Sequence, residues 1–458
     1  MVLSYLKSYV TNTVPQKPVP FVNKQDQTEA GLPDIIKQSV KELSEGYSYW
    51  LYPFLSSGHL QTAYTAVRKF ENRDEVCYKR RLMTVEDIRY KVNDDELPYD
   101  RWEGQSTFAI DYVVAPGNED KEHERFKPES QVLDLPPRTE YLDPSKEQSL
   151  LDDESKPLVI ALHGLSGGSF ESYLRAFVHK ITQEPYGFDA LVLNSRGCAN
   201  HTITSPQLFC GLWTNDLRYL INEHILKKWP NKRIYLIGFS LGGAIIANYL
   251  GQEYDAVSKN IKASIIVSSP WSFPDSSYRL QESLLGNRLY SPAMCQNLLK
   301  LLKNHYEGHL KYDNVVDDYH KNPESYKVEK LKDFDDNFTS RLFGFNCADE
   351  YYRHASPSNR ISKIRVPTIL LNSQDDPIAS YKSLPETEIK LNPYTVLIGT
   401  TIGGHLGWFD YKGDRWYAEP ASNLFKELDK NWEINEKALK SSDLPLVEPT
   451  WKYDRIVS

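Results

Sequence analysis

The stretch IYLIGFSLGGAIIANYLG, residues 234–251, decides the fold class of this chain. A continuous apolar run leads into a Gly-Phe-Ser-Leu-Gly turn, and a second apolar run with helical spacing follows. The turn fits the pattern G-x-S-x-G, in which a sharp strand-to-helix connection lifts a serine hydroxyl above the edge of a sheet. Gly238 and Gly242 keep side chains out of that crowded turn. The stretch therefore predicts a nucleophile elbow with Ser240 at its tip.

Five further stretches of the chain resemble the run before the elbow. Each is short and continuously apolar, and the set comprises residues 157–164, 188–197, 263–269, 366–373 and 394–400. Strands that are apolar on both sides are buried on both faces, and helical patterns separate several of these runs. Alternating strands and helices predict an α/β fold, with a mostly parallel central sheet and helices on both faces.

Composition along the chain suggests six segments. They are an N-terminal tail and approach segment (1–45), N-terminal strands with a charged loop (46–156), the first half of the core (157–271), a helical cap insertion (272–360), the second half of the core (361–436) and a loose C-terminal tail (437–458). The insertion is too long for a connection within a sheet. We expect it to cover the active edge, because such insertions tend to lie where ligands bind; the alternative is a helical elaboration away from the site.

Bulk composition narrows the classes of function. The 458 residues carry a net charge of -8, which argues against a nucleic-acid-binding protein. Five cysteines without a C-x-x-C pair argue against a zinc site or a disulfide framework, and they favour reduced thiols in an intracellular compartment. No cofactor or metal is expected. No apolar segment reaches the length of about 18 residues needed to span a bilayer, and no secretory signal is evident.

A serine hydroxyl needs a base to act as a nucleophile, and chain order identifies the candidate base. In this architecture the order is serine, then an acid, then histidine. Of the eleven histidines, only His405 lies beyond the late strand predicted at 366–373. It stands in TIGGHLGW, where two glycines allow a loop to carry the imidazole over the sheet edge. His405 is therefore the predicted general base, and a surface-loop histidine is the alternative.

The acid that orients this histidine is expected at the end of the preceding strand. The sequence LLNSQDDPIAS offers Asp375 and Asp376 there. We predict Asp375, because Asp376 precedes a proline and is suited to cap or close the turn. Asp275, which follows an earlier strand, is a third candidate.

Catalysis also requires donors for a developing oxyanion. The backbone N–H of Leu241, directly after the nucleophile, is one expected donor, and the N–H of Leu165 in LHGLSGGS is the other. His163, in the same loop, is predicted to be structural, because chain order excludes it as the base. The H-x-x-x-x-D spacing of His405 and Asp410 is treated as coincidental.

Taken jointly and in order, these motifs resemble one family. LVIALHGLSGGS, LVLNSRGCAN, LIGFSLGGAIIANYLG, LLNSQDDPI and GGHLGW are similar to the α/β-hydrolase superfamily group that contains abhydrolase-domain lipases 1 and 3, the YheT-type hydrolases and the yeast medium-chain fatty acid ethyl ester synthase/esterases. SSGHLQTAYTAV (56–67) resembles the N-terminal signature of that group, and GLWTNDLRYLIN resembles its yeast esterases linked to monoacylglycerol lipase activity. The family's nucleophile, acid and base fall on Ser240, Asp375 and His405.

The resemblance implies a serine esterase or lipase acting on small lipid-like esters, with monoacylglycerol as the expected substrate. The alternative on the same triad is transfer of an acyl group from acyl-CoA to ethanol, and the alternative from another class is a non-catalytic binding protein of the same fold. We expect no nucleic-acid partner, an intracellular location, and peripheral contact with a membrane or lipid droplet.

Overall fold

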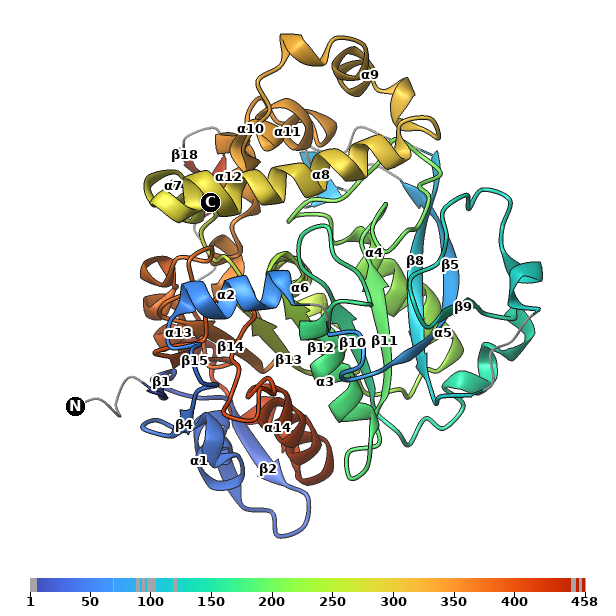
Figure 1. Ribbon diagram of the computed structural model, residues 1–458. Coiled ribbons are helices and arrows are strands. Elements are labelled where there is room, and N and C mark those ends of the chain that lie inside the picture. The colour runs from blue at the N-terminus through green and yellow to red at the C-terminus, as the bar shows by residue number, and fades with distance from the viewer. Residues whose placement is uncertain are drawn as a thin grey trace.

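A large sheet forms the centre of the molecule (Figure 1). The computed structural model describes residues 6–68, 70–87, 91–92, 95–96, 104–117, 122–445, 450–452 and 455–457. Within these residues the sheet has eleven strands. Their order across the sheet is β4 (Ser48–Trp50), β1 (Lys7–Thr13), β15 (Thr395–Thr400), β14 (Thr368–Ser373), β13 (Ile261–Val267), β12 (Ile234–Phe239), β10 (Leu158–Leu162), β11 (Asp189–Asn194), β8 (Gly104–Val114), β5 (Cys77–Asp87) and β9 (Thr139–Tyr141).

The six strands from β11 to β15 across the middle of the sheet are parallel to their neighbours. Strands β8 and β1 join this block antiparallel at its two sides. The prediction of a mostly parallel sheet is confirmed. Because the block is parallel, the carboxyl ends of β10, β12 and β14 share one edge of the sheet, where α/β proteins place their ligands.

Helices cover both faces of the sheet, as the continuous apolar runs predicted. Val159 and Ala161 of β10 pack in one core, while Leu158 and Ile160 pack in the other. The first core includes side chains from α1 (Leu32–Ser39), α3 (Ser172–Thr182) and α14 (Ala418–Asn431). The second includes side chains from α4 (Asn215–Tyr219), η6 (Leu220–Ile225), α6 (Leu241–Glu253) and α13 (Glu386–Leu391).

The segment 272–360 is helical and lies between β13 and β14 in the chain. It contains α7 (Phe273–Glu282), η8 (Gly286–Tyr290), α8 (Ser291–His305), α9 (Asn314–Lys321), α10 (Leu331–Phe334), η11 (Asp335–Thr339), α11 (Ser340–Leu342) and α12 (Ala348–Ala355). In Figure 1 these helices, yellow to orange, lie above α6 and the strand ends. Their apolar side chains share a third core with the loop that follows β11.

Short 3-10 turns connect many of these elements. The other described strands and α-helices are β2 (Pro20–Asn23), β3 (Glu29–Gly31) and β16 (Trp432–Ile434), which form one small sheet, α2 (Gly58–Val67), α5 (Leu226–Lys228), β6 (Lys91–Val92) with β7 (Asp95–Glu96), and β17 (Thr450–Lys452) with β18 (Arg455–Val457). Of these, α2 has a direct bearing on the site, because it packs beside the loop that carries His405.

The prediction that residues 1–45 form a tail is wrong. Strand β1 pairs antiparallel with β15 inside the main sheet, and α1 packs its apolar face in the first core. The sequence of β1, KSYVTNT, is mostly polar, and within this strand only Ser8 and Val10 are buried. Such a strand next to the sheet edge lacks the apolar pattern that marks buried strands. The expected loose C-terminal segment also contacts the body, since Leu439 and Leu444 pack against the first core.

A buried ion pair ties the antiparallel strands to the loop after β10. Arg80 of β5 makes a bidentate pair with Asp111 of β8, with Nε–Oδ1 and Nη2–Oδ2 distances of 2.7 and 2.8 Å. Oδ2 of Asp111 also accepts from the hydroxyl of Ser169 at 2.6 Å and the amide of Asn194 at 2.8 Å. Burial opposes ionisation of this carboxyl, but Arg80 and these donors outweigh it and hold the pKa of Asp111 below its usual value.

Candidate active site

Ser240 occupies a strained turn between β12 and α6. Its φ and ψ are 52° and -118°, a region that non-glycine residues rarely adopt. A Cβ atom on Gly238 would lie 2.5 Å from the carbonyl oxygen of Gly242, and one on Gly242 would lie 2.5 Å from the carbonyl oxygens of Leu162 and His163. Both glycines are therefore required by close backbone packing, as the motif predicted. The turn presents the hydroxyl of Ser240 at the carboxyl edge of the sheet.

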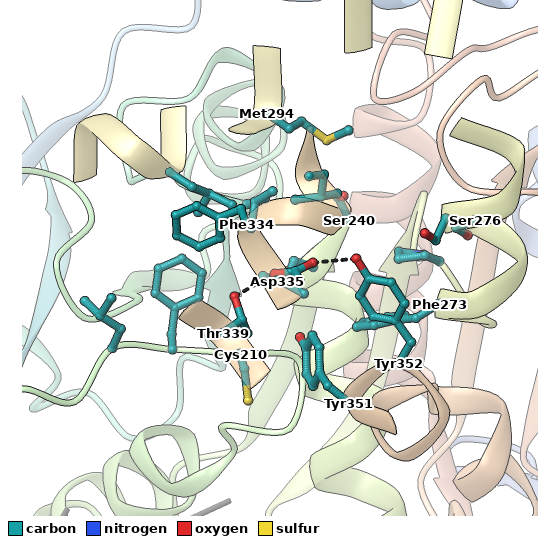
Figure 2. A pocket seen from close by; sticks show the side chains of 18 of the residues that line it. Cys210, Ser240, Phe273, Ser276, Met294, Phe334, Asp335, Thr339, Tyr351 and Tyr352 are labelled. Atoms are coloured by element: carbon teal, nitrogen blue, oxygen red, sulfur yellow. Dashed lines mark hydrogen bonds between the residues drawn. The ribbon is translucent and has the colours of Figure 1, made fainter. Parts of the chain in front are cut away.

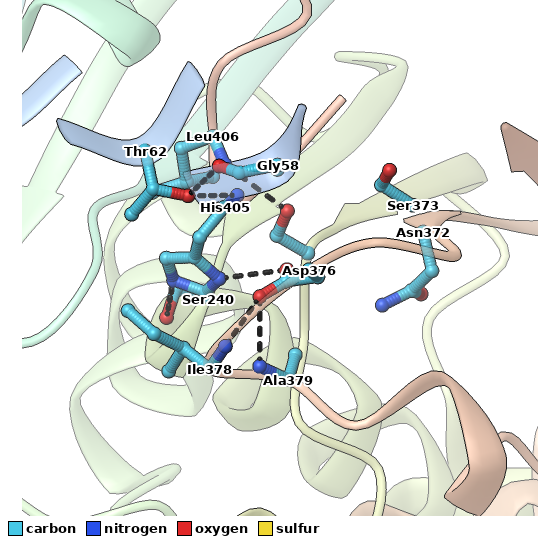
Figure 3. A network of polar contacts seen from close by, with 12 residues as sticks. Gly58, Thr62, Ser240, Asn372, Ser373, Asp376, Ile378, Ala379, His405 and Leu406 are labelled. Atoms are coloured by element: carbon cyan, nitrogen blue, oxygen red, sulfur yellow. Dashed lines mark hydrogen bonds and ion pairs between the residues drawn. The ribbon is translucent and has the colours of Figure 1, made fainter. Parts of the chain in front are cut away.

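The imidazole of His405 links this hydroxyl to a carboxylate (Figure 3). Its Nε2 lies 2.9 Å from Oγ of Ser240, and its Nδ1 lies 2.8 Å from Oδ2 of Asp376. A carboxylate can only accept, so Nδ1 carries the proton and Nε2 is left to accept from the serine. Both the histidine and the aspartate are buried. This is the tautomer in which a histidine can take a proton from a serine.

The prediction that Asp375 is the acid that orients His405 is wrong, because Asp376 contacts the imidazole. Oδ1 of Asp375 accepts hydrogen bonds from the backbone N–H groups of Gly403 and Gly404, at 3.0 and 2.9 Å, and from the hydroxyl of Ser373 at 2.7 Å. Asp375 thus fixes the start of the loop that carries His405, and the next residue contacts the imidazole.

Asp376 both closes its turn and orients the histidine, although the sequence analysis treated these two roles as alternatives. Its Oδ1 accepts from the N–H groups of Ile378 and Ala379, at 2.8 and 2.9 Å, which is the turn-closing role expected of it. Its Oδ2 remains for the imidazole of His405. A carboxylate has about four acceptor positions, so capping a turn does not prevent it from orienting a histidine.

The third candidate for the acid, Asp275, and the coincidental Asp410 both lie apart from this contact. Asp275 is exposed in the first turn of α7. Asp410 accepts from the N–H groups of Lys412 and Asp414, at 2.9 and 3.0 Å, and so closes a turn of its own.

Helix α2 holds the histidine loop in place, a role that the sequence reasoning missed. Oγ1 of Thr62 accepts from the N–H of His405 at 2.9 Å and donates to the carbonyl of Gly58 at 2.7 Å. A Cβ on Gly58 would lie 2.0 Å from the carbonyl oxygen of Asp375, and one on Gly404 would lie 2.4 Å from that of Gly58. The helix therefore touches both the acid turn and the histidine loop. The motif SSGHLQTAYTAV, quoted above for its resemblance, was the available signal.

The loop after β10 lies against the nucleophile. A Cβ on Gly164 would lie 3.3 Å from Cβ of Ser240. Nδ1–H of His163 donates to the carbonyl of Gly164 at 2.7 Å, and Nε2 accepts from the N–H of Ser195 at 3.1 Å. Burial lowers the pKa of His163 to about 4, so the ring is neutral and fixes this loop, as predicted.

An apolar cavity opens above Ser240, between the sheet edge and the helices of residues 272–360 (Figure 2). Leu165 and Leu241, the two expected oxyanion donors, both line it beside Ser240. Leu241 begins α6, so its N–H is among the first-turn groups that have no acceptor within a helix. Leucine and aromatic side chains from the loop around 208–210, α7, α8, α10, α11 and α12 form most of the wall. The arrangement suits a substrate with a long apolar portion.

One carboxyl group also lines this cavity. Asp335 is only 7% exposed. Burial raises its pKa from 3.8 to about 6, although hydrogen bonds from Thr339 and Tyr352 partly offset the effect. Among the described residues, no group of three or more histidine, cysteine, aspartate or glutamate side chains could hold a metal ion.

Comparisons with known proteins identify the family to which this chain belongs. A family model described as alpha/beta hydrolase fold matches residues 157–399. The monoacylglycerol lipase of Saccharomyces cerevisiae is 40% identical over 442 residues, which cover 94% of this chain and 92% of that protein. The chain belongs to the α/β-hydrolase fold family, and the predicted class of enzyme, a carboxylic ester hydrolase, is confirmed.

Two further relatives show how the similarity spreads through this family. The medium-chain fatty acid ethyl ester synthase/esterase 2 of the same yeast is 29% identical over 425 residues, covering 89% of this chain and 92% of that protein. Phospholipase ABHD3 of Homo sapiens is 29% identical over 273 residues, covering 59% of this chain and 63% of that protein. The predicted family group is therefore confirmed.

The two adjacent aspartates provide a matched test of the site. We expect Asp376→Asn to lower kcat for a p-nitrophenyl ester by about 10⁴-fold, because the amide would favour the wrong imidazole tautomer. Asp375→Asn keeps an acceptor oxygen for the two glycine N–H groups, so we expect it to lose tenfold or less. Steady-state kinetics, with circular dichroism to check folding, measure the difference. An equal loss in the two variants would contradict the assignment.

The buried carboxyl of Asp335 should make stability depend on pH. Its folded-state pKa of about 6 exceeds the unfolded value, so the folded protein binds the proton more tightly and loses stability as pH rises through 6. The side chain of Asp335→Asn does not ionise, so the variant does not lose this stability. We therefore expect the free energy of unfolding of the variant minus that of wild type to rise by up to about 3 kcal/mol between pH 4 and pH 7.5. Urea unfolding at both pH values measures it; a difference that is constant with pH would contradict the expectation.

Proposed function

We propose that this protein hydrolyses monoacylglycerols through an acyl-enzyme formed on Ser240. The observation that carries the proposal is the 2.9 Å contact between Nε2 of His405 and Oγ of Ser240 beside an apolar cavity. The similarity to a yeast protein named as a monoacylglycerol lipase, along nearly the whole chain, supports the substrate class.

The first half of the reaction forms the acyl-enzyme. Oγ of Ser240 attacks the ester carbonyl while Nε2 of His405 takes its proton, and Asp376 stabilises the imidazolium. The N–H groups of Leu241 and Leu165 are the proposed donors to the oxyanion. The carbon–oxygen bond to glycerol then breaks, and the imidazolium gives its proton to the departing alcohol oxygen.

The second half releases the fatty acid. Water takes the place of glycerol, His405 removes a proton from it, and the resulting hydroxide adds to the acyl carbon. Collapse of the intermediate returns a proton to Oγ of Ser240 and frees the acid. The apolar wall of the cavity would hold the acyl chain, at about 0.8 kcal/mol per buried CH₂ group.

Transfer to an alcohol is the second candidate on the same acyl-enzyme, because a relative is named for ethyl ester synthesis as well as esterase activity. In that reaction the oxygen of ethanol attacks the acyl carbon in place of water. Incubation with an acyl-CoA and ethanol, followed by measurement of ethyl ester and free acid, separates the two. Ester formation no greater than that of a Ser240→Ala control would exclude this candidate.

We also propose that the outer side of the segment 278–289 contacts a lipid surface. Helix α7 supplies Phe273 and Leu280 to the cavity, while the segment exposes Leu284 and Leu289, at 65% and 51%. Exposed apolar side chains directly after the helix that walls the cavity suit a substrate held in a lipid layer. All five cysteines are free thiols, which supports an intracellular location. Across the described ranges, none of the helices combines the length and apolarity that membrane crossing requires.

The main test is hydrolysis of monoacylglycerol by wild type and Ser240→Ala. We expect equal amounts of free acid and glycerol from wild type and a rate lower by at least about 10⁴-fold in the variant. A fluorophosphonate probe should label Ser240 in the folded protein, as located by mass spectrometry. A wild type that neither reacts with the probe nor releases acid would favour a non-catalytic binding protein.

The lipid contact is tested with vesicles of phosphatidylcholine. Burial of two leucines contributes about 3 kcal/mol or more, so we expect Leu284→Ser combined with Leu289→Ser to reduce vesicle binding by about 100-fold. Leu391→Ser, which changes a leucine 53% exposed on α13, is the matched control and should bind like wild type. Activity on the water-soluble ester p-nitrophenyl butyrate should stay within about twofold. Unchanged flotation of the double variant with vesicles would contradict the proposal.

A further inference from the structure

The cavity beside Ser240 carries a small polar area on an otherwise apolar wall. We call this area the polar recess and define it by Asp335 of η11, Tyr352 of α12 and Ser276 of α7, all of which line the cavity. Each comes from a different helix of the segment 272–360. An acyl chain has no group that could satisfy them, so their presence in this wall requires a separate explanation.

Asp335 has accepting capacity that the protein leaves unused. Its Oδ1 accepts from Oγ1 of Thr339 and its Oδ2 from the hydroxyl of Tyr352, both at 2.6 Å. Figure 2 shows the carboxyl group between these two hydroxyls. A carboxylate offers about four acceptor positions, which leaves two. In the part of the chain that the structure describes, no lysine, arginine or histidine forms an ion pair with it.

Ser276 is a second group with an unmet requirement. Its side chain is 7% exposed, and within the described ranges its Oγ has no hydrogen-bond partner. A buried hydroxyl without a partner costs free energy, and such groups in native proteins call for an explanation. A ligand hydroxyl entering the cavity would supply the missing partner.

The two groups together select a chemical class of ligand. Lys332 lies near Asp335 but forms ion pairs with Asp336 and Asp349 instead. A carboxylate without an ion-pair partner repels anions and accepts hydrogen bonds from neutral alcohols. A hydroxyl such as that of Ser276 both donates and accepts. The complement is a neutral group with more than one free hydroxyl, whereas a phosphate, a free carboxylate or a bare alkyl group would not fit.

We propose that the polar recess binds the free hydroxyls of the glycerol head of the substrate, with one hydroxyl donating to Asp335 and another pairing with Ser276. This inference rests on the proposed hydrolysis of monoacylglycerols, and it adds which residues recognise the alcohol part. The recess shares the cavity with Ser240, Leu165 and Leu241. An ester held at the nucleophile therefore lies in the same cavity as the recess, and we assign its alcohol part to the recess and its acyl chain to the apolar wall. The recess takes no part in the chemical step. It would bind the ground state and the transition state alike, and its loss would appear mainly in KM.

The experiment compares two substrates that differ only in these hydroxyls. One is a monoacylglycerol, and the other is the propyl ester of the same fatty acid, which keeps the three carbons of the alcohol and lacks both hydroxyls. We expect wild type to prefer the monoacylglycerol in kcat/KM by roughly tenfold or more, because the propyl ester leaves both recess groups unpaired.

Two variants locate that preference. Ser276→Ala removes a buried hydroxyl that makes no bond within the described protein, so we expect stability equal to or slightly above that of wild type. We expect a three- to tenfold fall in kcat/KM for the monoacylglycerol, carried by KM. Asp335→Asn should reduce kcat/KM for the monoacylglycerol by roughly tenfold or more. Both should leave the propyl ester within about twofold of wild type. Leu280→Met, which changes an apolar part of the same wall, is the control and should affect the two substrates equally.

The outcomes separate this inference from the proposed function. If wild type hydrolyses both esters equally well, or if the variants lose activity on both equally, the recess does not bind glycerol hydroxyls, although ester hydrolysis stands. If wild type hydrolyses neither ester and the fluorophosphonate probe leaves Ser240 unlabelled, the proposed function itself fails. A fall confined to the monoacylglycerol, with Ser276→Ala no less stable than wild type in urea unfolding, supports the recess.

Discussion

The site depends on the close approach of the α6 N-terminus to the ends of β10 and β12. The backbone atoms there are so near that any Cβ at position 238 or 242 would overlap a carbonyl group. This contact forces Ser240 into its strained conformation and brings the loop of Gly164 against it. Strain of this kind persists only when surrounding structure over-determines it, and two fully buried cores on either side of the sheet provide that support.

The histidine reaches the serine through a second set of contacts, made by segments far apart in the chain. Thr62 of α2 fixes the backbone of His405, and Asp375 fixes the glycines before it. Asp376 then orients the ring. The carboxylate of Asp375 holds the backbone at the start of the loop, and the carboxylate of Asp376 holds the ring, so little freedom is left for the imidazole before substrate binds. Pre-organisation of this kind is what lets a histidine act without the cost of reorganisation.

Much of this arrangement could be predicted from the sequence because it depends on local rules. Ser240, Gly238 and Gly242 follow from the geometry of a strand-to-helix turn, and His405 follows from chain order. The choice between Asp375 and Asp376 could not be made in this way. Both stand in one turn, and which carboxylate faces the imidazole depends on backbone angles and on glycines about 28 residues later in the chain.

The other misses have a similar cause. Strand β1 is polar and gains its place from pairing with β15, nearly 400 residues away, so its own pattern does not mark it as a strand. The role of α2 in holding the histidine loop depends on contacts between residues 58–62 and 404–405, which no local pattern encodes. Such features follow from tertiary contacts, and the motif of α2 became interpretable only when its neighbours were known.

Two buried carboxylates illustrate how the surroundings of a charge indicate its purpose. Asp111 is fully buried, yet Arg80, Ser169 and Asn194 supply a cation and donors, and its pKa falls. That combination is self-sufficient and stabilises the fold around the loop that follows β10. Asp335 is also buried, but it receives two hydroxyl donors and no paired cation in the described chain, and its pKa rises. A charge buried for stability alone would be paired like Asp111. Asp335 instead keeps unused acceptor positions on the wall of a cavity that also contains Ser240, and we attribute them to hydrogen bonds with a bound ligand.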